Sequence, residues 1–286
     1  MTRQTASGDG SRHNMVMEGQ KQFIALGSRL QEIPEVLTLG VKPNFLDYTP
    51  AQREMIYAAD VILFPTLGYA QFFNTSGKTI FPSLETHLYA DEKIMQTTLF
   101  YLQKIVHPRT RFYYPLHHND ILKDFTFPFV GKIPRRSAQG RGVFLIRDEG
   151  DMKKYLSLTK IAYIQEYLPH EKDLRVILLN YDPVLAYWRI REAEEFRANV
   201  FQGGRISFDD VPLDGIALAR EAALKCRFDD VGMDLIRHKN NWYVIEANMK
   251  YGRKGLKMKG LDIKQLILAK LLSGEIPAAD SFRGYC

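Results

Sequence analysis

Residues 231–248 read VGMDLIRHKNNWYVIEAN, and this stretch decides the fold. Two apolar runs flank the polar residues 239–241, which is the pattern of two strands joined by a tight turn. If that turn has three residues, Asp234 lies opposite Glu246. Because the side chains of a strand alternate between its two faces, Glu246 and Asn248 point to the same side. The hairpin is therefore predicted to gather three oxygen-bearing side chains on one face.

These three side chains suit a metal ion. Magnesium that accompanies a nucleotide prefers hard oxygen ligands and accepts only a few protein carboxylates. The ordinary alternative is a solvated hairpin face, since exposed acids on hairpins are common. The apolar neighbours of Asp234 and Glu246 argue against that alternative, because an acid inside an apolar strand needs a partner. We predict that Asp234, Glu246 and Asn248 hold a metal.

Length and composition are those of a soluble globular enzyme. The chain has 286 residues, of which 45% are hydrophobic and 25% charged, enough for two or three domains of about 100–150 residues. Its apolar runs, such as 61–64, fall far short of the roughly 20 residues that span a bilayer. Two cysteines give neither a disulfide framework nor metal-ligand spacing. Residues 1–20 are polar and are expected to form a disordered tail, and the protein is expected to be cytoplasmic.

The net charge of +6 is unevenly distributed along the chain. Scattered Lys and Arg on solvated faces are the common origin of such a charge. Here the basic residues also form clusters, at 132–141, 189–197 and 250–259. Such clusters suit phosphate groups, either of a nucleotide or of a nucleic acid.

The rest of the pattern predicts a mixed chain of helices and strands. Apolar residues at helical spacing from 83 to 106 predict one helix with Lys93 in its middle. Strands are expected at 129–133, 143–146, 161–166, 174–180 and 184–191. Helices are expected at 214–227 and after Asp262, which can cap the last of them.

A glycine-containing loop, SAQGRG at 137–142, lies between two of these strands. Glycines let backbone amides approach phosphate oxygens closely. The loop lacks the spacing of a Walker motif and a strand follows it, so a plain hairpin turn is the alternative. Lys132 just before the loop can neutralise phosphate charge, although a single strand lysine is more often a surface residue.

Seven short motifs occur in the order found in one enzyme family. They are Lys132, QGRG at 139–142, QEYL at 165–168, DLR at 173–175, FRAN at 196–199 with Gly203 and Gly204, Asp234, and EAN at 246–248. Each motif alone is weak, but the ordered set is specific. In this order they resemble the RimK-like branch of the ATP-grasp ligases, over roughly residues 83–272.

The resemblance implies a fold of the α/β (α+β) class, the ATP-grasp fold. It would have a small N-terminal α/β domain at 21–90, a central lid domain at 91–168 and a C-terminal antiparallel-sheet catalytic domain at 169–286. ATP would lie between the last two domains.

The resemblance also implies which residues bind ATP. Lys93 and Lys132 would hold its phosphates, residues 166–168 would form the hinge that reads adenine, and Asp173 would bond the ribose hydroxyls. The plain alternatives are a lysine on a helix surface for Lys93, a strand end for residues 166–168 and an acid in a turn for Asp173. The complete implied set is Lys93, Lys132, Gln139, Gly140, Gly142, Glu166, Tyr167, Leu168, Asp173, Arg197 and Asn199.

The resemblance also implies that arginines take part in the transfer of the phosphoryl group. Arg197, with Asn199, would contact the terminal phosphate, and Arg189 or Arg191 would face the carboxylate that is activated. The solvent face of a strand is the alternative for these arginines. The hairpin triplet would hold one or two magnesium ions, or manganese, with Glu246 bridging.

The activity implied is ATP-dependent ligation of a carboxylate to an amine, with small-molecule or peptide substrates. A carboxylate is a poor electrophile, and its phosphorylation needs magnesium with Lys and Arg to neutralise the developing charge. Residues 249–255 read MKYGRKG where the family usually has a Ser-Pro-Gly turn, so the acceptor side is not assigned.

Two other functions remain open at this point. An ATP-grasp kinase would use the same nucleotide site but transfer phosphate to a hydroxyl group. A basic nucleic-acid-binding protein would explain the charge, but the intact set of Asp234, Glu246 and Asn248 argues against nucleic acid as the partner. The sequence is compatible with a homo-oligomer without specifying one.

Overall fold

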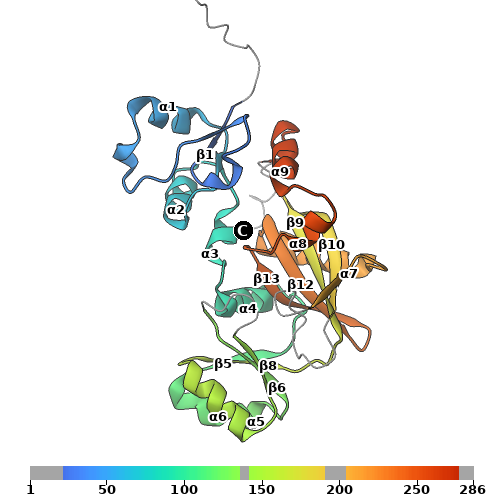
Figure 1. Cartoon of the computed structure of the whole chain (residues 1–286). Helices are drawn as coiled ribbons and strands as arrows, with labels where there is room; N and C mark the ends of the chain where they lie inside the picture. The colour runs from blue at the N-terminus through green and yellow to red at the C-terminus, as the bar shows by residue number, and fades with distance from the viewer. Residues whose placement is uncertain (1–21, 136–141, 191–203, 277–286) are drawn as a thin grey trace, which may run out of the picture.

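The computed structural model describes residues 22–135, 142–190 and 204–276. Figure 1 shows three sheet-containing regions that follow one another along the chain, with the hairpin of residues 230–248 in the third. The tail at 1–20 lies outside the described residues. In the part of the chain that the structure describes, no helix is long and apolar enough to cross a membrane.

The first region holds a parallel four-stranded sheet of strand order β2-β1-β3-β4. Its strands are short and apolar, as expected of parallel strands that are covered on both faces. The strands are β1 (Phe23–Ala25), β2 (Val36–Thr38), β3 (Ile62–Leu63) and β4 (Ile80–Phe81). The helices are η1 (Ser28–Leu30), η2 (Phe45–Asp47), α1 (Pro50–Ala58) and α2 (Leu67–Thr75).

The second region is an antiparallel four-stranded sheet of order β5-β8-β6-β7. Its core is rich in aromatic residues, and the Tyr155 ring packs over Gly131, where an added Cβ would lie only 3.0 Å from it. The strands are β5 (Thr110–Tyr113), β6 (Phe129–Lys132), β7 (Val143–Ile146) and β8 (Ala162–Glu166). The helices are η3 (Pro115–Asp120), α5 (Ile121–Asp124) and α6 (Glu149–Leu158).

The third region is a five-stranded sheet of order β11-β10-β9-β12-β13, with all neighbours antiparallel. The strands are β9 (Lys172–Leu179), β10 (Asp182–Ile190), β11 (Arg205–Ser207), β12 (Asp230–His238) and β13 (Asn241–Asn248). The helices are α7 (Leu213–Cys226), α8 (Lys254–Met258) and α9 (Ile263–Leu272).

The central strand β9 explains how this sheet can be buried and still carry charge. Leu174, Val176 and Leu178 pack with α7 in one core, whereas Ile177 packs with α9 in another. Since strand side chains alternate, Arg175 lies on the same face as Ile177. The polar start of this face belongs to the candidate site.

The single helix predicted at 83–106 is wrong. The chain forms α3 (Leu84–Leu88) and then α4 (Lys93–Leu102). Asp91 lies between them with a φ of 59°, a left-handed conformation that a continuous α-helix does not contain. Lys93 is therefore the first residue of α4, not a residue in the middle of a long helix.

The predicted three-residue turn of the hairpin is also wrong, although the pairing of Asp234 with Glu246 is confirmed. The turn consists of Lys239 and Asn240, whose φ angles of 47° and 66° match the two-residue hairpin turn. A bulge at Ile245 adds one residue to β13. The shorter turn and the extra residue compensate, and the two acids again lie opposite each other.

Candidate active site

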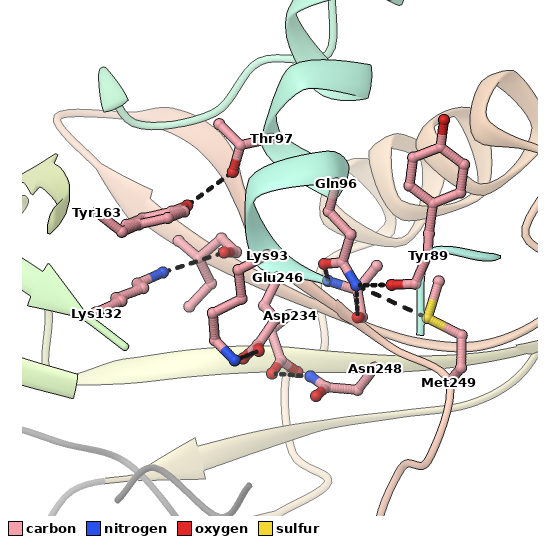
Figure 2. Close-up of polar contacts among 12 residues, drawn as sticks. Tyr89, Lys93, Gln96, Thr97, Lys132, Tyr163, Asp234, Glu246, Asn248 and Met249 are labelled. Carbon is pink, nitrogen blue, oxygen red and sulfur yellow. Dashed lines mark hydrogen bonds and ion pairs between the residues drawn. The ribbon is translucent and has the colours of Figure 1, made fainter. Parts of the chain in front are cut away.

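The candidate site lies where the second and third regions meet. Figure 2 shows Lys93 at the start of α4, Lys132 at the end of β6, and Asp234, Glu246 and Asn248 on the β12–β13 hairpin. The structure thus brings together side chains from positions more than a hundred residues apart in the chain.

Asp234 is the buried centre of this group, with 3% of its surface exposed. Arg175 donates to both of its carboxylate oxygens, with Nη2 2.7 Å from Oδ2. Arg189 Nη2 lies 2.9 Å from the same oxygen, and Asn248 Nδ2 donates to it at 2.9 Å. Burial alone raises the pKa of Asp234, but the two guanidinium groups outweigh burial and hold this pKa below its ordinary value.

Asp173 is a second buried acid, and it pairs with Arg189. Burial raises the pKa of Asp173 to about 6, against the attraction of Arg189, and the charge of Asp234 adds to the rise. Arg189 therefore links the two acids. Its side chain is 13% exposed, so it is held in place and not extended into solvent.

Two lysines from different elements lie near Glu246, one on α4 and one on β6. Lys93 Nζ lies 3.1 Å from Glu246 Oε1. Lys132 is 7% exposed and its Nζ lies 5.5 Å from the centre of the Tyr163 ring. Burial lowers the pKa of Lys132 to about 8; Glu246 opposes this effect and Lys93 adds to it. An anionic ligand beside this lysine would raise its pKa again.

The bulge in β13 has a direct role in this arrangement. A bulged residue is left out of the ladder of backbone hydrogen bonds. The carbonyl of Ile245 instead accepts a hydrogen bond from Lys132 Nζ at 3.3 Å. The same local irregularity therefore sets Glu246 opposite Asp234 and holds Lys132 beside the pair.

The predicted hinge lies at the end of β8. Glu166 pairs with the backbone of Arg109: its own N–H donates to the Arg109 carbonyl at 2.9 Å, and its carboxylate accepts from the Arg109 N–H at 2.6 Å. Tyr167 and Leu168 follow and are half-buried. Gly142 is buried, and its carbonyl accepts from the N–H of Ile133 at 2.7 Å.

Several predicted site residues lie outside the described residues. They are Gln139, Gly140, Arg191, Arg197 and Asn199. Their contribution stays a prediction.

Sequence reasoning missed two residues of the site as site residues. Arg175 occurs inside an apolar strand, two residues after Asp173, and that period places both on one face, so a signal was present. Gln96 of α4 is 3% exposed and bonds the backbone of Ala247. A single glutamine in a helix gives no comparable signal.

The charges and donors of the site fit a nucleotide with its metal. The described side chains of the site include four cations and three anions. The cations are Lys93, Lys132, Arg175 and Arg189, and the anions are Asp173, Asp234 and Glu246. The described residues contain no group of three His, Cys, Asp or Glu able to hold a bare metal ion. Two carboxylates and one amide oxygen are hard donors that suit magnesium when phosphate oxygens complete the coordination.

Comparison with known families places the chain. Residues 90–271 match the RimK-like ATP-grasp domain. The coenzyme γ-F420-2:α-L-glutamate ligase of Methanococcus maripaludis is 27% identical over 203 residues, which cover 66% of this chain and 69% of that protein. The ribosomal protein bS6–L-glutamate ligase of Salmonella paratyphi B is 29% identical over 143 residues, or 48% of this chain and 47% of that protein. This chain thus spans about half the length of the second relative.

Solved structures confirm the predicted fold. A RimK domain ATP-grasp protein of Sphaerobacter thermophilus superposes with a TM-score of 0.62 at 14% identity, over 87% of this chain and 98% of that one. The D-alanine–D-alanine ligase of Bacillus anthracis, solved with ATP, gives a TM-score of 0.62 at 13% identity, over 90% of this chain and 100% of that one. The matched domain covers well over half of the sequence, and the chain therefore belongs to the RimK-like ATP-grasp family.

Proposed function

We propose that this protein is an ATP-dependent carboxylate–amine ligase that forms an acyl phosphate and transfers the acyl group to an amine. The observation that carries the proposal is the hairpin pair of Asp234 and Glu246, flanked by Lys93 and Lys132. This arrangement combines metal donors with cations for phosphate groups. The ATP-grasp fold itself implies ATP binding.

The substrates we propose are an amino acid or peptide carboxylate and an amine. The relatives from M. maripaludis and S. paratyphi B are both named as L-glutamate ligases. Another solved relative, the ATP-grasp ligase PsnB in complex with its minimal precursor, has a TM-score of 0.63 at 14% identity, over 89% of this chain and 99% of that one. These names support the substrate class and leave the particular acid and amine to experiment.

Magnesium is proposed as the metal, with Asp234, Glu246 and Asn248 as its protein ligands. When bound with ATP it would neutralise charge that develops on the transferred phosphoryl group. Asp234 is held ionised by Arg175 and Arg189, as a ligand must be. Glu246 bonds Lys93, and a bound nucleotide would give that lysine a phosphate partner and leave the carboxylate to bind metal.

The basic side chains serve the transfer directly. Lys93 and Lys132 bind the phosphates of ATP; they come from α4 and β6 and contact neighbouring residues of β13, Glu246 and Ile245. Arg189 lies between Asp173 and Asp234. Arg189 is proposed to orient the acid to be activated. Because its Nε and Nη2 pair with Asp173 and Asp234, it would have to exchange one of these partners for the substrate carboxylate.

The reaction then follows from ordinary acyl chemistry. A carboxylate oxygen attacks the terminal phosphorus of ATP, and ADP leaves with the electron pair of the broken P–O bond. The amine attacks the acyl carbon, loses a proton, and inorganic phosphate departs with the former carboxylate oxygen. Charge stabilisation and positioning provide the catalysis, and no protein nucleophile takes part.

An ADP-release screen over amino acids and peptides, followed by product mass, tests this function. We expect ADP release that requires both an acid and an amine, with a product heavier than the acid by the amine minus water. A stable phosphate monoester of a hydroxyl substrate would instead identify a kinase with the same nucleotide site.

A further inference from the structure

Gln96 is a buried polar side chain of α4 that bonds the backbone at the end of β13. Its Oε1 accepts a hydrogen bond from the Ala247 N–H at 3.2 Å, and its Nε2 donates to the Ala247 carbonyl at 2.9 Å. Nε2 also donates to the Tyr89 carbonyl at 2.8 Å, and Met249 Sδ lies 3.9 Å from Nε2. Figure 2 shows the amide reaching the strand from the helix that also carries Lys93.

The position of Ala247 gives this contact its significance. β13 is an edge strand of its sheet, so among the described residues one side of it has no neighbouring strand. In an antiparallel strand, the N–H and carbonyl of one residue point to the same edge, and those of its two neighbours point to the opposite edge. Glu246 and Asn248 therefore pair with β12, and the outward groups of Ala247 are bonded by Gln96.

We propose that Gln96 is a positioning residue for the metal ligands Glu246 and Asn248. The Gln96 amide acts as a one-residue strand that fixes the Ala247 backbone from outside, while β12 fixes its neighbours from inside. The side chains of Glu246 and Asn248 therefore extend from a stretch of backbone that is held on both edges. This inference rests on the proposed function, because it concerns the metal that Glu246 and Asn248 are proposed to bind.

The chemistry of magnesium makes such support consequential. Magnesium requires nearly ideal octahedral geometry, whereas calcium accepts more ligands in flexible arrangements. Loss of a group that orients metal ligands typically lowers metal affinity by about 10–100-fold. A loosened β13 should therefore affect the binding of magnesium much more than the binding of calcium.

The test compares Gln96→Leu and Gln96→Glu with the wild-type chain. Leucine keeps the volume but removes all the hydrogen bonds, whereas glutamate keeps the acceptor for the Ala247 N–H. Thr98→Val is the matched control, since Thr98 is exposed on the same helix and bonds only the Ile94 carbonyl among the described contacts. Calorimetry measures ADP binding without metal, and then magnesium or calcium binding to the ADP complex; thermal unfolding records the stability of each variant.

We expect Gln96→Leu to lower magnesium affinity by about 10–100-fold and calcium affinity by less than about threefold, with ADP binding in the absence of metal unchanged. Gln96→Glu keeps the acceptor but turns an oxygen toward the Ala247 and Tyr89 carbonyls, so it should lower magnesium affinity at least as much as Gln96→Leu, whereas Thr98→Val should match the wild type. If Gln96→Leu unfolds at the assay temperature, Gln96→Glu alone decides the question.

Two results would overturn the inference. One is magnesium affinity that stays within about twofold of wild type in a folded Gln96 variant. The other is an equal loss for magnesium, calcium and metal-free ADP, which would indicate a general loss of structure. A wild-type chain that binds neither ADP nor magnesium with ADP would instead contradict the proposed function, so the two failures are distinguishable.

Discussion

Glu246 is the residue on which the proposed chemistry depends most. It is 28% exposed at its side chain and pairs with Lys93, so it is not part of the folded core. Glu246→Gln keeps the shape of the side chain but removes the charge that would balance the metal. We expect a normal unfolding temperature and a fall in substrate-dependent ADP release of ~100-fold or more. Near-normal ADP release from a folded variant would remove Glu246 from the site.

Lys132 provides a second residue-level prediction. Lys132→Ala removes a buried cation that faces the site, and ATP affinity measured by calorimetry should fall by about tenfold or more. Because burial of the charged form is unfavourable, as its lowered pKa indicates, this variant should not lose stability through the lost charge. Lys123→Ala is the control, since Lys123 belongs to the same region and is 76% exposed at its side chain. Equal ATP affinity in both variants would show that Lys132 does not contact the nucleotide.

At the level of single residues, the sequence singled out several members of the candidate site. Acids in apolar strands must find partners, which singled out Asp234 and Glu246. What the sequence could not give is the nature of those partners. Asp173 was predicted to bond ribose, and that role stays a prediction, but the structure pairs it with Arg189. Such a pair depends on the register of two strands, which sequence alone leaves open.

Helix α3 shows how a short element is attached to the five-stranded sheet. Asp229, just before β12, accepts hydrogen bonds from the Ser83 N–H and the Thr86 hydroxyl, each at 2.9 Å. Burial raises the pKa of Asp229 to about 7, against these hydrogen bonds. The folded chain therefore holds a proton on Asp229 that the unfolded chain, with an ordinary carboxyl pKa, releases near pH 4.

This shift predicts a pH dependence of stability. Between about pH 4 and 7 the folded state binds more protons at Asp229 than the unfolded state does, so this group makes the free energy of unfolding fall as pH rises. Asp229→Asn does not titrate and should lack this contribution. The unfolding free energy of the wild type minus that of the variant should decrease between pH 4 and 7. Parallel profiles in denaturant titrations would show that Asp229 does not titrate in that range.

At the level of elements, the strands predicted between residues 129 and 191, the two hairpin strands and α7 are confirmed. Five strands of two to four residues each were not predicted, because segments so short show no clear period: β1, β2, β4, β5 and β11. The errors in the other elements have local physical causes. The long helix predicted at 83–106 ignores Asp91, whose left-handed φ of 59° separates α3 from α4. The hairpin pairing was right because a shorter turn and a bulge at Ile245 offset each other. Neither feature has a strong sequence signal, since Lys239 and Asn240 are not the favoured glycine-containing pair for such a turn.

The whole molecule explains why the site needs more than one region. Lys132 comes from the second sheet and bonds the carbonyl of Ile245 in the third, while Lys93 and Gln96 come from the helix between the first two sheets. Figure 1 shows α4 between the first region and the second. The order of motifs predicted the family, but this convergence could not be read from spacing along the chain. On this basis we propose the domain boundaries at residues 90 and 168.

The fate of a labelled carboxylate oxygen tests the central claim most directly. With the carboxylate substrate labelled with oxygen-18, a ligase that proceeds through an acyl phosphate must transfer one labelled oxygen to inorganic phosphate. We predict one labelled oxygen in each phosphate released in step with the amide product, as measured by mass spectrometry. Unlabelled phosphate, or a phosphate group retained on a hydroxyl product, would contradict the account.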